Sequence, residues 1–441
     1  MLRNHHADPT SAIDSSNIAR LRQAWSFEAP APVSHTPLIE SGRVYAADWD
    51  GNVYAFDAQT GDVVWRNKVE QPKTQWPWHG FAGTGALGGG MVFQASTEGT
   101  AFALDARTGE VRWRTRITDD PHAGSICRLT HIGGIVLVGL QSVEEPLTKM
   151  MQNFTPDFQG EVMALDAATG WIVWRTPLVR PPHNGVAVWS SFAVDPQTFV
   201  VYFTTGNNYT GEATPLSDSI VAVNGRNGEI LWASQVTQND VWTMAHQRGP
   251  DYDFGGGPQI FDVVIGGRVR RLVGAGQKSG IFYVWDRYTG QPVWSSSIGY
   301  GGVDGGMHGE ASIGRDRIIA WSNNNYSHTT PPAQSNLSIK ALDPATGRYL
   351  WVNDNAQPAL LFSAGFLADD VYLLGSLDAK LRAYSAGDGQ QVWSADLPGP
   401  VTSALSGDGG RVLLGTGAPG VFGSWASGGK NTVTAFALPQ Q

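Results

Sequence analysis

Two carboxylates stand one residue apart in the stretch GPDYDFGGGPQIF, which runs from Gly249 to Phe261. Asp251 and Asp253 are followed by three glycines and by a run that is typical of a β-strand. Such a pair can bind a hard cation, accept a proton from a substrate, or act as two acids in hydrolysis. A lone acidic pair beside glycine is more often a turn cap, so its role depends on the residues that share its site.

Other polar residues interrupt the chain at comparable places. Glu144 and Glu145 follow one strand-like run, Asn207 follows another, and Lys278 follows a third. Carboxylate and amide oxygens are ligands that Ca²⁺ prefers, and a lysine ammonium pairs with an anion or a carbonyl oxygen. Each residue alone is typical of a solvated loop or turn. If the strands belong to neighbouring repeats, the side chains meet at one end of the fold and form a site.

The elements that position these residues form a sequence repeat. A strand, a turn of the type LDAxTG and a second strand ending in tryptophan recur about every 40 to 60 residues. The aspartate can accept hydrogen bonds from the turn amides, and the glycine can adopt the positive φ that the turn requires. The seven copies end at Trp65, Trp113, Trp174, Trp232, Trp294, Trp351 and Trp393. This pattern predicts four-stranded propeller blades in which each tryptophan packs on the next blade.

An eighth blade can be assembled from both ends of the chain. The C-terminal runs VLLGTG and VTAFAL lack a following tryptophan, whereas LRQAWSFE carries Trp25 without a preceding blade. Joining them closes the ring and removes exposed sheet edges. We therefore expect an all-β, eight-bladed β-propeller as a single domain over residues 1–441, with a strand around Trp25 completing the last blade and no haem c domain.

Composition and charge exclude several classes of function. The net charge of -9 provides no basic surface for nucleic acid or for an anionic membrane. Cys127 is the only cysteine, so the chain contains no disulfide and no CxxCH haem attachment motif. No apolar run reaches the roughly 18 residues that span a bilayer, and the polar start is unlike a signal peptide. We expect no nucleic-acid partner and no membrane span.

The repeats and the polar stretches together resemble a known family. GVAVWSSFAVDP, TTGNNYTGEA, DYDFGGGPQIFDV and GAGQKSGIFYVWDRYTG are similar to segments of the quinoprotein alcohol dehydrogenases. Members of this family hold pyrroloquinoline quinone (PQQ) and a metal ion on the axis of an eight-bladed propeller. QSVEE, GNNY and GPDYDFG resemble the polyvinyl alcohol dehydrogenase branch, and the resemblance covers nearly the whole chain.

The resemblance implies roles for individual residues. Glu144, with Glu145 as the near alternative, falls on the metal-ligating and cofactor-binding glutamate of the family, and Asn207 falls on its metal-ligating asparagine. Trp189 matches the tryptophan on which the quinone stacks. Lys278 matches the cation that binds the quinone carbonyls and assists catalysis.

The resemblance also makes Asp251 the catalytic base and Asp253 a neighbour that can join the metal ligands. The choice between them stays open, because an insertion separates GPDYD from the tryptophan of the family's DxWD motif. The implied reaction oxidises an alcohol, on the branch resemblance a secondary one, by hydride transfer to PQQ with Ca²⁺ or another divalent or lanthanide ion. The implied partners are a small or polymeric alcohol and a separate electron acceptor such as a cytochrome c, in the periplasm or outside the cell.

The chain departs from the family above the quinone, where many relatives carry two adjacent cysteines. Cys127 alone cannot form that pair. His79, Met307, His308 and Trp425 are the candidates to cover the cofactor, although a buried structural side chain is the ordinary role of each type.

Two other functions fit the same repeats. A non-catalytic propeller of the outer-membrane assembly type, which docks peptides, shares the blades but has no reason to keep together the set Glu144, Trp189, Asn207, Asp251 and Lys278. A hydrolytic or glycan-binding propeller could use Glu144 and Asp251 as paired acids, yet it leaves Trp189 and Lys278 unexplained. The dehydrogenase is therefore the preferred interpretation.

Overall fold

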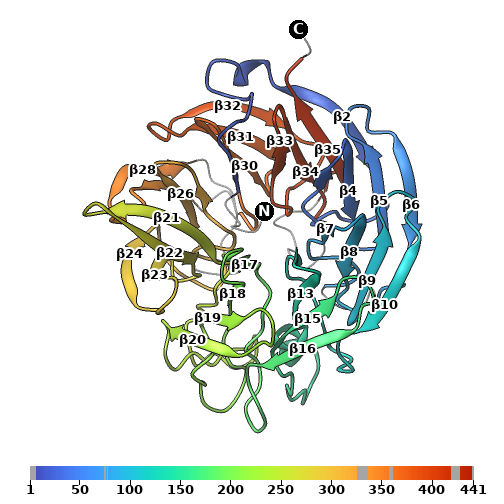
Figure 1. Ribbon diagram of the computed structural model, residues 1–441, viewed down its shortest axis with the longest axis vertical. Helices are drawn as coiled ribbons and strands as arrows, with labels where there is room; N and C mark the ends of the chain where they lie inside the picture. Colours follow the sequence, from blue (N-terminus) through green and yellow to red (C-terminus); the bar gives the residue numbers. More distant parts are fainter. Residues whose placement is uncertain are drawn as a thin grey trace.

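The chain folds into eight sheets arranged in a ring: seven have four antiparallel strands, and one has four antiparallel strands extended by the short parallel strand β1 (Ala7–Asp8) (Figure 1). The computed structural model describes residues 6–73, 76, 78–324, 336–356, 361–418 and 428–439. The sheets radiate from a common axis, and the last strand of a blade, such as β6, β16 or β24, lies on the rim of the ring. The predicted all-β, eight-bladed propeller is confirmed.

We number the blades in ring order. Blades 1 to 4 contain β3–β6 (Leu38–Glu40, Arg43–Ala47, Asn52–Asp57, Val63–Lys68), β7–β10 (Ala86–Gly88, Met91–Ala95, Thr100–Asp105, Val111–Arg116), β12, β13, β15 and β16 (Thr130–Ile132, Ile135–Gly139, Glu161–Asp166, Ile172–Pro177), and β17–β20 (Ala193–Val194, Val200–Thr204, Ser219–Asn224, Ile230–Gln235). Blades 5 to 8 contain β21–β24 (Gln259–Ile265, Arg268–Gly276, Ile281–Asp286, Pro292–Ser297), β25–β28 (Ser312–Ile313, Ile318–Asn323, Leu337–Leu342, Tyr349–Ala356), β29–β32 (Phe366–Ala368, Val371–Ser376, Lys380–Ser385, Gln391–Asp396), and β33–β35 with β2 (Ser406–Asp408, Arg411–Gly415, Thr432–Ala437, Arg22–Glu28).

Burial changes from the axis to the rim as the sequence pattern requires. The inner strand β4 is buried from Val44 to Ala47, because both of its faces pack on neighbouring blades. In the outer strand β6 the only buried residue is Trp65. A continuous apolar run therefore marks an inner strand, and a single large aromatic residue marks the rim.

The outer tryptophans dock each blade on the next. In seven of them the indole Nε1 donates a hydrogen bond to a carbonyl oxygen in the turn of the following blade, and the ring of Trp393 packs on that of Phe436 in the following blade (6.2 Å between centroids). The pairs are Trp25 and Ala58, Trp65 and Ala106, Trp113 and Ala167, Trp174 and Gly225, Trp232 and Arg287, Trp294 and Pro344, and Trp351 and Ala386. The turn glycine lies on the same ring: a Cβ added to Gly228, whose φ is +74°, would lie 2.6 Å from Cε3 of Trp174. The predicted tryptophan-docking repeats are confirmed.

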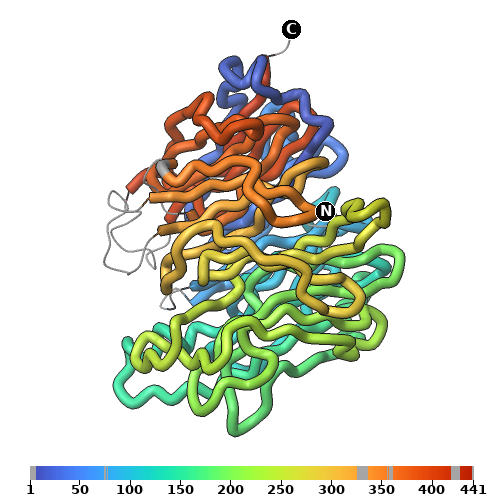
Figure 2. Tube along the Cα trace, turned by 90° about the vertical axis from the view of Figure 1, so that its left-hand side faces the viewer, coloured from blue at the N-terminus to red at the C-terminus, as the bar shows by residue number. Residues whose placement is uncertain are grey.

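The two ends of the chain share blade 8. Strand β2 pairs antiparallel with β35, and Trp25 lies opposite Ala435. The blue N-terminal strand lies beside the red C-terminal strands in Figure 1, and blue and red segments also adjoin in the side view of Figure 2. Before β2, the chain forms β1 (Ala7–Asp8) and a 3-10 helix (Ile18–Arg20).

The largest local departure from the repeat lies in blade 3. Between β13 and β15 the chain forms β14 (Gln141–Ser142), which pairs with β11 (Ala123–Gly124), and then α1 (Glu144–Met150). Within the described ranges, no helix is long and apolar enough to cross a membrane.

Candidate active site

A cavity of about 920 Å³ lies at the centre of the ring. Its lining includes a residue two to four positions before the first strand of every blade, so the repeat itself supplies the walls. In ring order these residues are Thr36, Thr84, Arg128, Ser190, Gly255, Glu310, Ser363 and Thr402.

Lys278 and the two predicted aspartates form an ion-paired group in this cavity. Asp251 and Asp253 precede β21 and Lys278 follows β22, so blade 5 positions all three. Lys278 Nζ lies 2.7 Å from Asp251 Oδ2 and 3.9 Å from Asp253 Oδ2. The side chains of Lys278, Asp251 and Asp253 are only 8%, 2% and 9% exposed.

Two factors determine the ionisation of this group: the burial of its side chains, and the presence of two carboxylates beside only one ammonium. Burial raises the pKa of Asp251 well above its ordinary value; Lys278 opposes this shift and Asp253 adds to it. Burial lowers the pKa of Lys278, but the two carboxylates outweigh it, and the net shift is upward. The buried Oδ1 of Asp251 accepts no hydrogen bond from the described residues. The group can therefore take up a proton or a second cation.

Asp240, which the sequence did not single out, holds the turn at Asp251 in place. Its carboxylate accepts hydrogen bonds from the backbone N–H groups of Asp251 (3.2 Å) and Tyr252 (2.7 Å). The backbone of Asp251 is left-handed, with φ at +59°, a conformation that is costly for a residue with a side chain. A fully buried carboxylate behind the turn stabilises that conformation.

Asn207 presents an amide oxygen to the same group. Its backbone N–H donates to Asp253 Oδ1 (2.8 Å), and its Nδ2 donates to the carbonyl oxygens of Asn208 (2.6 Å) and Trp242 (2.8 Å). These bonds fix the side-chain amide, and its buried Oδ1 is left without a hydrogen-bond partner in the described part of the chain. Buried acceptors are normally satisfied, so this oxygen is suited to a ligand such as a hard cation.

Helix α1 brings only one of the two adjacent glutamates to the cavity. Glu145 lines it, and burial together with Asp253 and Asp251 raises the pKa of Glu145 well above its ordinary value. Glu144 lies outside the lining, and its carboxylate accepts hydrogen bonds from the backbone N–H groups of Phe158 (2.9 Å) and Asp157 (3.3 Å). Consecutive helical residues point about 100° apart. The structure thus brings Glu145, and not the expected Glu144, to Asp251 and Asp253.

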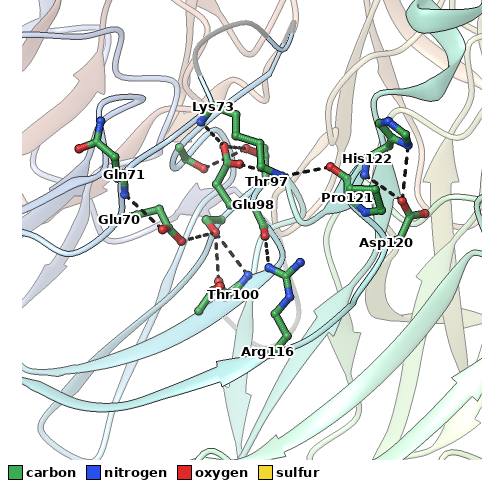
Figure 3. A network of polar contacts seen from close by, with 12 residues as sticks. Glu70, Gln71, Lys73, Thr97, Glu98, Thr100, Arg116, Asp120, Pro121 and His122 are labelled. Atoms are coloured by element: carbon green, nitrogen blue, oxygen red, sulfur yellow. Dashed lines mark hydrogen bonds and ion pairs between the residues drawn. The ribbon is translucent and has the colours of Figure 1, made fainter.

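Glu144 instead faces a group on the side of the ring. Ligand atoms of Asp120, His122 and Glu144 lie within 4.8 Å of one another. Figure 3 shows that Asp120 and His122 belong to a polar network in which Lys73 joins Glu98 (3.8 Å) to the carbonyl oxygen of Pro121 (3.2 Å). This network anchors the segment that leads to the cavity-lining Trp76 and His79.

Trp189 lies where a flat ligand could stack. It lines the cavity beside Gly255, and a Cβ added to Gly255 would lie 3.1 Å from Cη2 of Trp189 and 2.5 Å from the carbonyl oxygen of Met307. Only glycine fits there without pushing against the indole. An aromatic plane beside a backbone free of side chains is suited to a planar ring system.

The residues expected to cover the cofactor differ in whether they line the cavity. His79 and His308 both line the cavity, and the ring of His308 lies 5.0 Å from that of Phe362. Met307 is fully buried and does not line the cavity, because it packs against Gly276. Trp425 lies outside the described residues.

A second cation in the cavity, Arg128, was not predicted. It lies beside the strand start of blade 3, with Glu310 at the same place in blade 6 and His6 from the N-terminal segment close by. Its repeat position, equivalent to that of Thr84, is the signal that could have found it.

Two family models match the chain. Residues 159–297 match the model for the glucose/ethanol/alcohol dehydrogenase β-propeller domain, and this segment contains Trp189, Asn207, Asp251, Asp253 and Lys278. Residues 17–144 and 335–438, together more than half of the chain, match the model for the outer membrane protein assembly factor BamB.

Individual relatives are dehydrogenases. The chain is 26% identical over 451 residues to a polyvinylalcohol dehydrogenase from Pseudomonas sp, covering 94% of this chain and 70% of the relative. It is 27% identical over 435 residues to a polyvinylalcohol dehydrogenase from Sphingopyxis sp. (strain 113P3), covering 90% of this chain and 66% of the relative. The crystal structure of the quinohemoprotein alcohol dehydrogenase from Comamonas testosteroni superposes with a TM-score of 0.81 at 20% identity, over 100% of this chain and 80% of that chain, and so shares its fold.

Proposed function

The chain belongs to the quinoprotein alcohol dehydrogenase family of PQQ-repeat propellers, and we propose that it oxidises an alcohol to the carbonyl compound in its axial cavity. The observation that carries the proposal is the cluster of Glu145, Asn207, Asp251, Asp253 and Lys278 around unsatisfied buried oxygens.

The donor set fits a divalent metal ion. Three carboxylates, those of Glu145, Asp251 and Asp253, face one ammonium in the cavity, which leaves an excess of two negative charges when all are ionised. Buried charges without a counterion are strongly unfavourable. Carboxylate oxygens with the orphaned Oδ1 of Asn207 form the all-oxygen set that Ca²⁺ takes. Glu145, Asn207 and Asp253 would hold the ion.

The remaining lining fits a flat, anionic quinone. Trp189 would stack on PQQ, and Lys278 would meet its carbonyl oxygens. Arg128 would meet one of its carboxylates, because a guanidinium binds a carboxylate through two parallel hydrogen bonds. His79 and His308 would border the bound ring system.

Asp251 has the geometry of the general base. When bound, PQQ supplies the acceptor for the hydride that leaves the carbinol carbon, and Ca²⁺ polarises that acceptor. Asp251 accepts the proton of the substrate hydroxyl, so that loss of a proton and a hydride leaves the C=O bond. Asp240 fixes the position of Asp251, and Lys278 holds its second carboxylate oxygen at 2.7 Å. Asp253 is oriented by the N–H of Asn207 instead, which supports a role for it as a metal ligand.

The substrate we propose is a secondary alcohol, small or polymeric. Similarity to two polyvinylalcohol dehydrogenases supports this, since their named substrate is a polymer of secondary alcohols. The cavity lining includes Trp76, Trp78, Met150 and Met244, apolar side chains that suit a carbon chain. Electrons would leave to a separate acceptor such as a cytochrome c, and the periplasm or the cell exterior is the compartment implied by the family.

A peptide-docking scaffold is the alternative, and the match to the BamB model is the observation that favours it. That match covers blade repeats at the two ends of the chain, and its limits exclude Trp189, Asn207 and Lys278. The residues that a scaffold would not need lie in the segment that matches the dehydrogenase model. This division favours the enzyme.

Reconstitution tests the proposal. The apo-protein is incubated with PQQ and with Ca²⁺, Mg²⁺, La³⁺ or EDTA, and reduction of an artificial electron acceptor is followed with 2-propanol, 2,4-pentanediol, ethanol and 1-butanol. We expect turnover only with PQQ and a metal ion, and faster turnover of the secondary alcohols. Asp251→Asn should lower kcat about 1000-fold with PQQ binding retained, which is within the range for loss of a general base. Asp253→Asn should raise the metal concentration required for half-maximal activity.

PQQ binding is measured separately by quenching of tryptophan fluorescence. If the wild-type protein binds no PQQ with any of the metal ions, the dehydrogenase proposal is wrong and the docking scaffold is the better account. If Asp253→Asn, and not Asp251→Asn, abolishes turnover at saturating metal, the two aspartates exchange roles.

A further inference from the structure

The first described residues of the chain cross the axis of the propeller. Strand β1 pairs in parallel with β29 of blade 7, with Ala7 opposite Leu367. The carbonyl oxygen of His6 accepts hydrogen bonds from the N–H of Leu367 (3.0 Å) and from Oγ of Ser312 in blade 6 (2.9 Å). These bonds fix the backbone of His6 on one side of the ring.

The side chain of His6 reaches the opposite side. Its Nε2 lies 3.2 Å from Nη1 of Arg128, which lies two positions before the first strand of blade 3. Blades 3 and 7 are four places apart in a ring of eight and therefore face each other across the axis. The imidazole is only 4% exposed and belongs to the lining of the cavity. His6 thus lies between blades 3 and 7 at the centre of the ring and forms part of the cavity wall.

The contacts of His6 show which atom donates and which accepts a hydrogen bond. A guanidinium can only donate, so His6 Nε2 accepts from Arg128. Glu310 Oε2 lies farther from His6 Nε2, at 3.7 Å, and Glu310 Oε1 accepts a hydrogen bond from Ser191 Oγ. A neutral imidazole can orient the guanidinium without neutralising it. A carboxylate in the same place would cancel the charge that an anionic ligand needs.

We propose that His6, held by the segment that leads into β1, plugs the cofactor cavity on the axis and is a positioning residue that holds Arg128 ready for a carboxylate of the bound quinone. This inference rests on the proposed function, since it needs PQQ in the cavity. Without His6, Arg128 can turn further toward Glu310, with which it already interacts electrostatically, and water can enter the cavity where the imidazole was. Both changes weaken cofactor binding and speed its release.

The test compares wild type, His6→Ala, His6→Gln and the control His246→Ala, in which an exposed histidine is removed. PQQ affinity is measured by quenching of tryptophan fluorescence at saturating Ca²⁺, and PQQ release by dilution of the loaded protein. Glutamine can accept from Arg128 through its side-chain oxygen, so it should rescue most of the loss. We expect about tenfold weaker binding and faster release for His6→Ala, and values within about threefold of wild type for His6→Gln and His246→Ala.

Far-UV circular dichroism and the melting temperature of the apo-proteins show whether each variant is folded. Equal affinity of wild type and His6→Ala would overturn the proposal, as would an equal loss in His6→Ala and His6→Gln, which would mean that the contact with Arg128 is irrelevant. Failure of wild type itself to bind PQQ is a different result, because it overturns the proposed function.

Discussion

Two groups of potential ligands lie on either side of α1, and they are satisfied in different ways. In the axial cavity, Asn207 Oδ1 and Asp251 Oδ1 are buried without hydrogen-bond partners among the described residues. On the side of the ring, both oxygens of Glu144 accept from backbone N–H groups. The first group has unsatisfied oxygens that can bind a ligand, whereas the carboxylate of Glu144 in the second group is already hydrogen-bonded to the backbone.

The comparison shows that residue type and spacing do not by themselves identify a site. Glu144 and Glu145 are chemically identical neighbours, and α1 turns one to the cavity and the other to the loop around Phe158. The unsatisfied buried oxygens of Asn207 and Asp251 are what separates the axial group from the group around Glu144, because a native fold rarely leaves such atoms without a function.

The largest effect is expected from exchanging the two glutamates for their neutral isosteres one at a time. Glu145→Gln removes a charge from the cavity and should weaken Ca²⁺ binding by at least about 100-fold. Loss of a residue that only supports a metal ligand already costs up to about 100-fold, and Glu145 is proposed to be a ligand itself. Glu144→Gln should leave Ca²⁺ affinity within about threefold of wild type. Isothermal titration of the apo-proteins with Ca²⁺ measures both.

The pair is its own matched control, since the two positions share a helix and differ only in direction. A large loss in Glu144→Gln combined with a small one in Glu145→Gln would reverse the comparison and restore Glu144 as the ligand.

The scaffold could be predicted because it repeats. Seven copies of one motif predict the strand order, the turn type and the docking of each tryptophan. An ambiguous assignment in one copy can therefore be resolved by comparison with the others. Trp25 could be assigned to the last blade because the C-terminal repeat lacks a following tryptophan and Trp25 is not preceded by a repeat. The same redundancy placed Asn207 and Lys278 at strand ends facing one cavity.

The site could be predicted only in part, because its details depend on single segments. The short helix at Glu144 contains Pro146 and occurs once, so no repeat revealed which glutamate would face the axis. His6 and Arg128 are 122 residues apart, and their contact depends on closure of the whole ring. Asp240 lies eleven residues before Asp251 and acts on its backbone, a role without a sequence signature.

A smaller effect is expected from His35, a fully buried group with one satisfied and one unsatisfied nitrogen. Its Nε2 accepts from the N–H of Gly85 (3.1 Å), and no described residue pairs with its Nδ1. Burial and the charge of Arg128 lower the pKa of His35 to about 3. The unfolded chain therefore binds a proton below about pH 6.5 that the folded chain does not, and stability falls as the pH drops from 6.5 toward 3.

His35→Gln removes this proton while keeping an acceptor for Gly85. Between pH 7.5 and 5, the free energy of unfolding of wild type should fall by about 2 kcal/mol more than that of His35→Gln. Urea denaturation at the two pH values measures the difference, and the exposed His246 serves as control in His246→Gln. Identical pH dependence in wild type and His35→Gln would show that the imidazole is protonated in the folded state.

The smallest effect is expected at the rim, at a tryptophan whose indole N–H has a hydrogen-bond partner. Trp174 Nε1 donates to the carbonyl oxygen of Gly225 (3.0 Å), and Trp174→Phe removes that bond while keeping most of the aromatic packing. It should cost about 1 kcal/mol of unfolding free energy and leave Ca²⁺ affinity unchanged. Trp171→Phe, at a neighbouring position that is 79% exposed, should cost nothing measurable. Because the docking contacts recur around the ring, a change in Ca²⁺ affinity for Trp174→Phe would mean that the blades transmit strain to the axis, and the separation between scaffold and site would not hold.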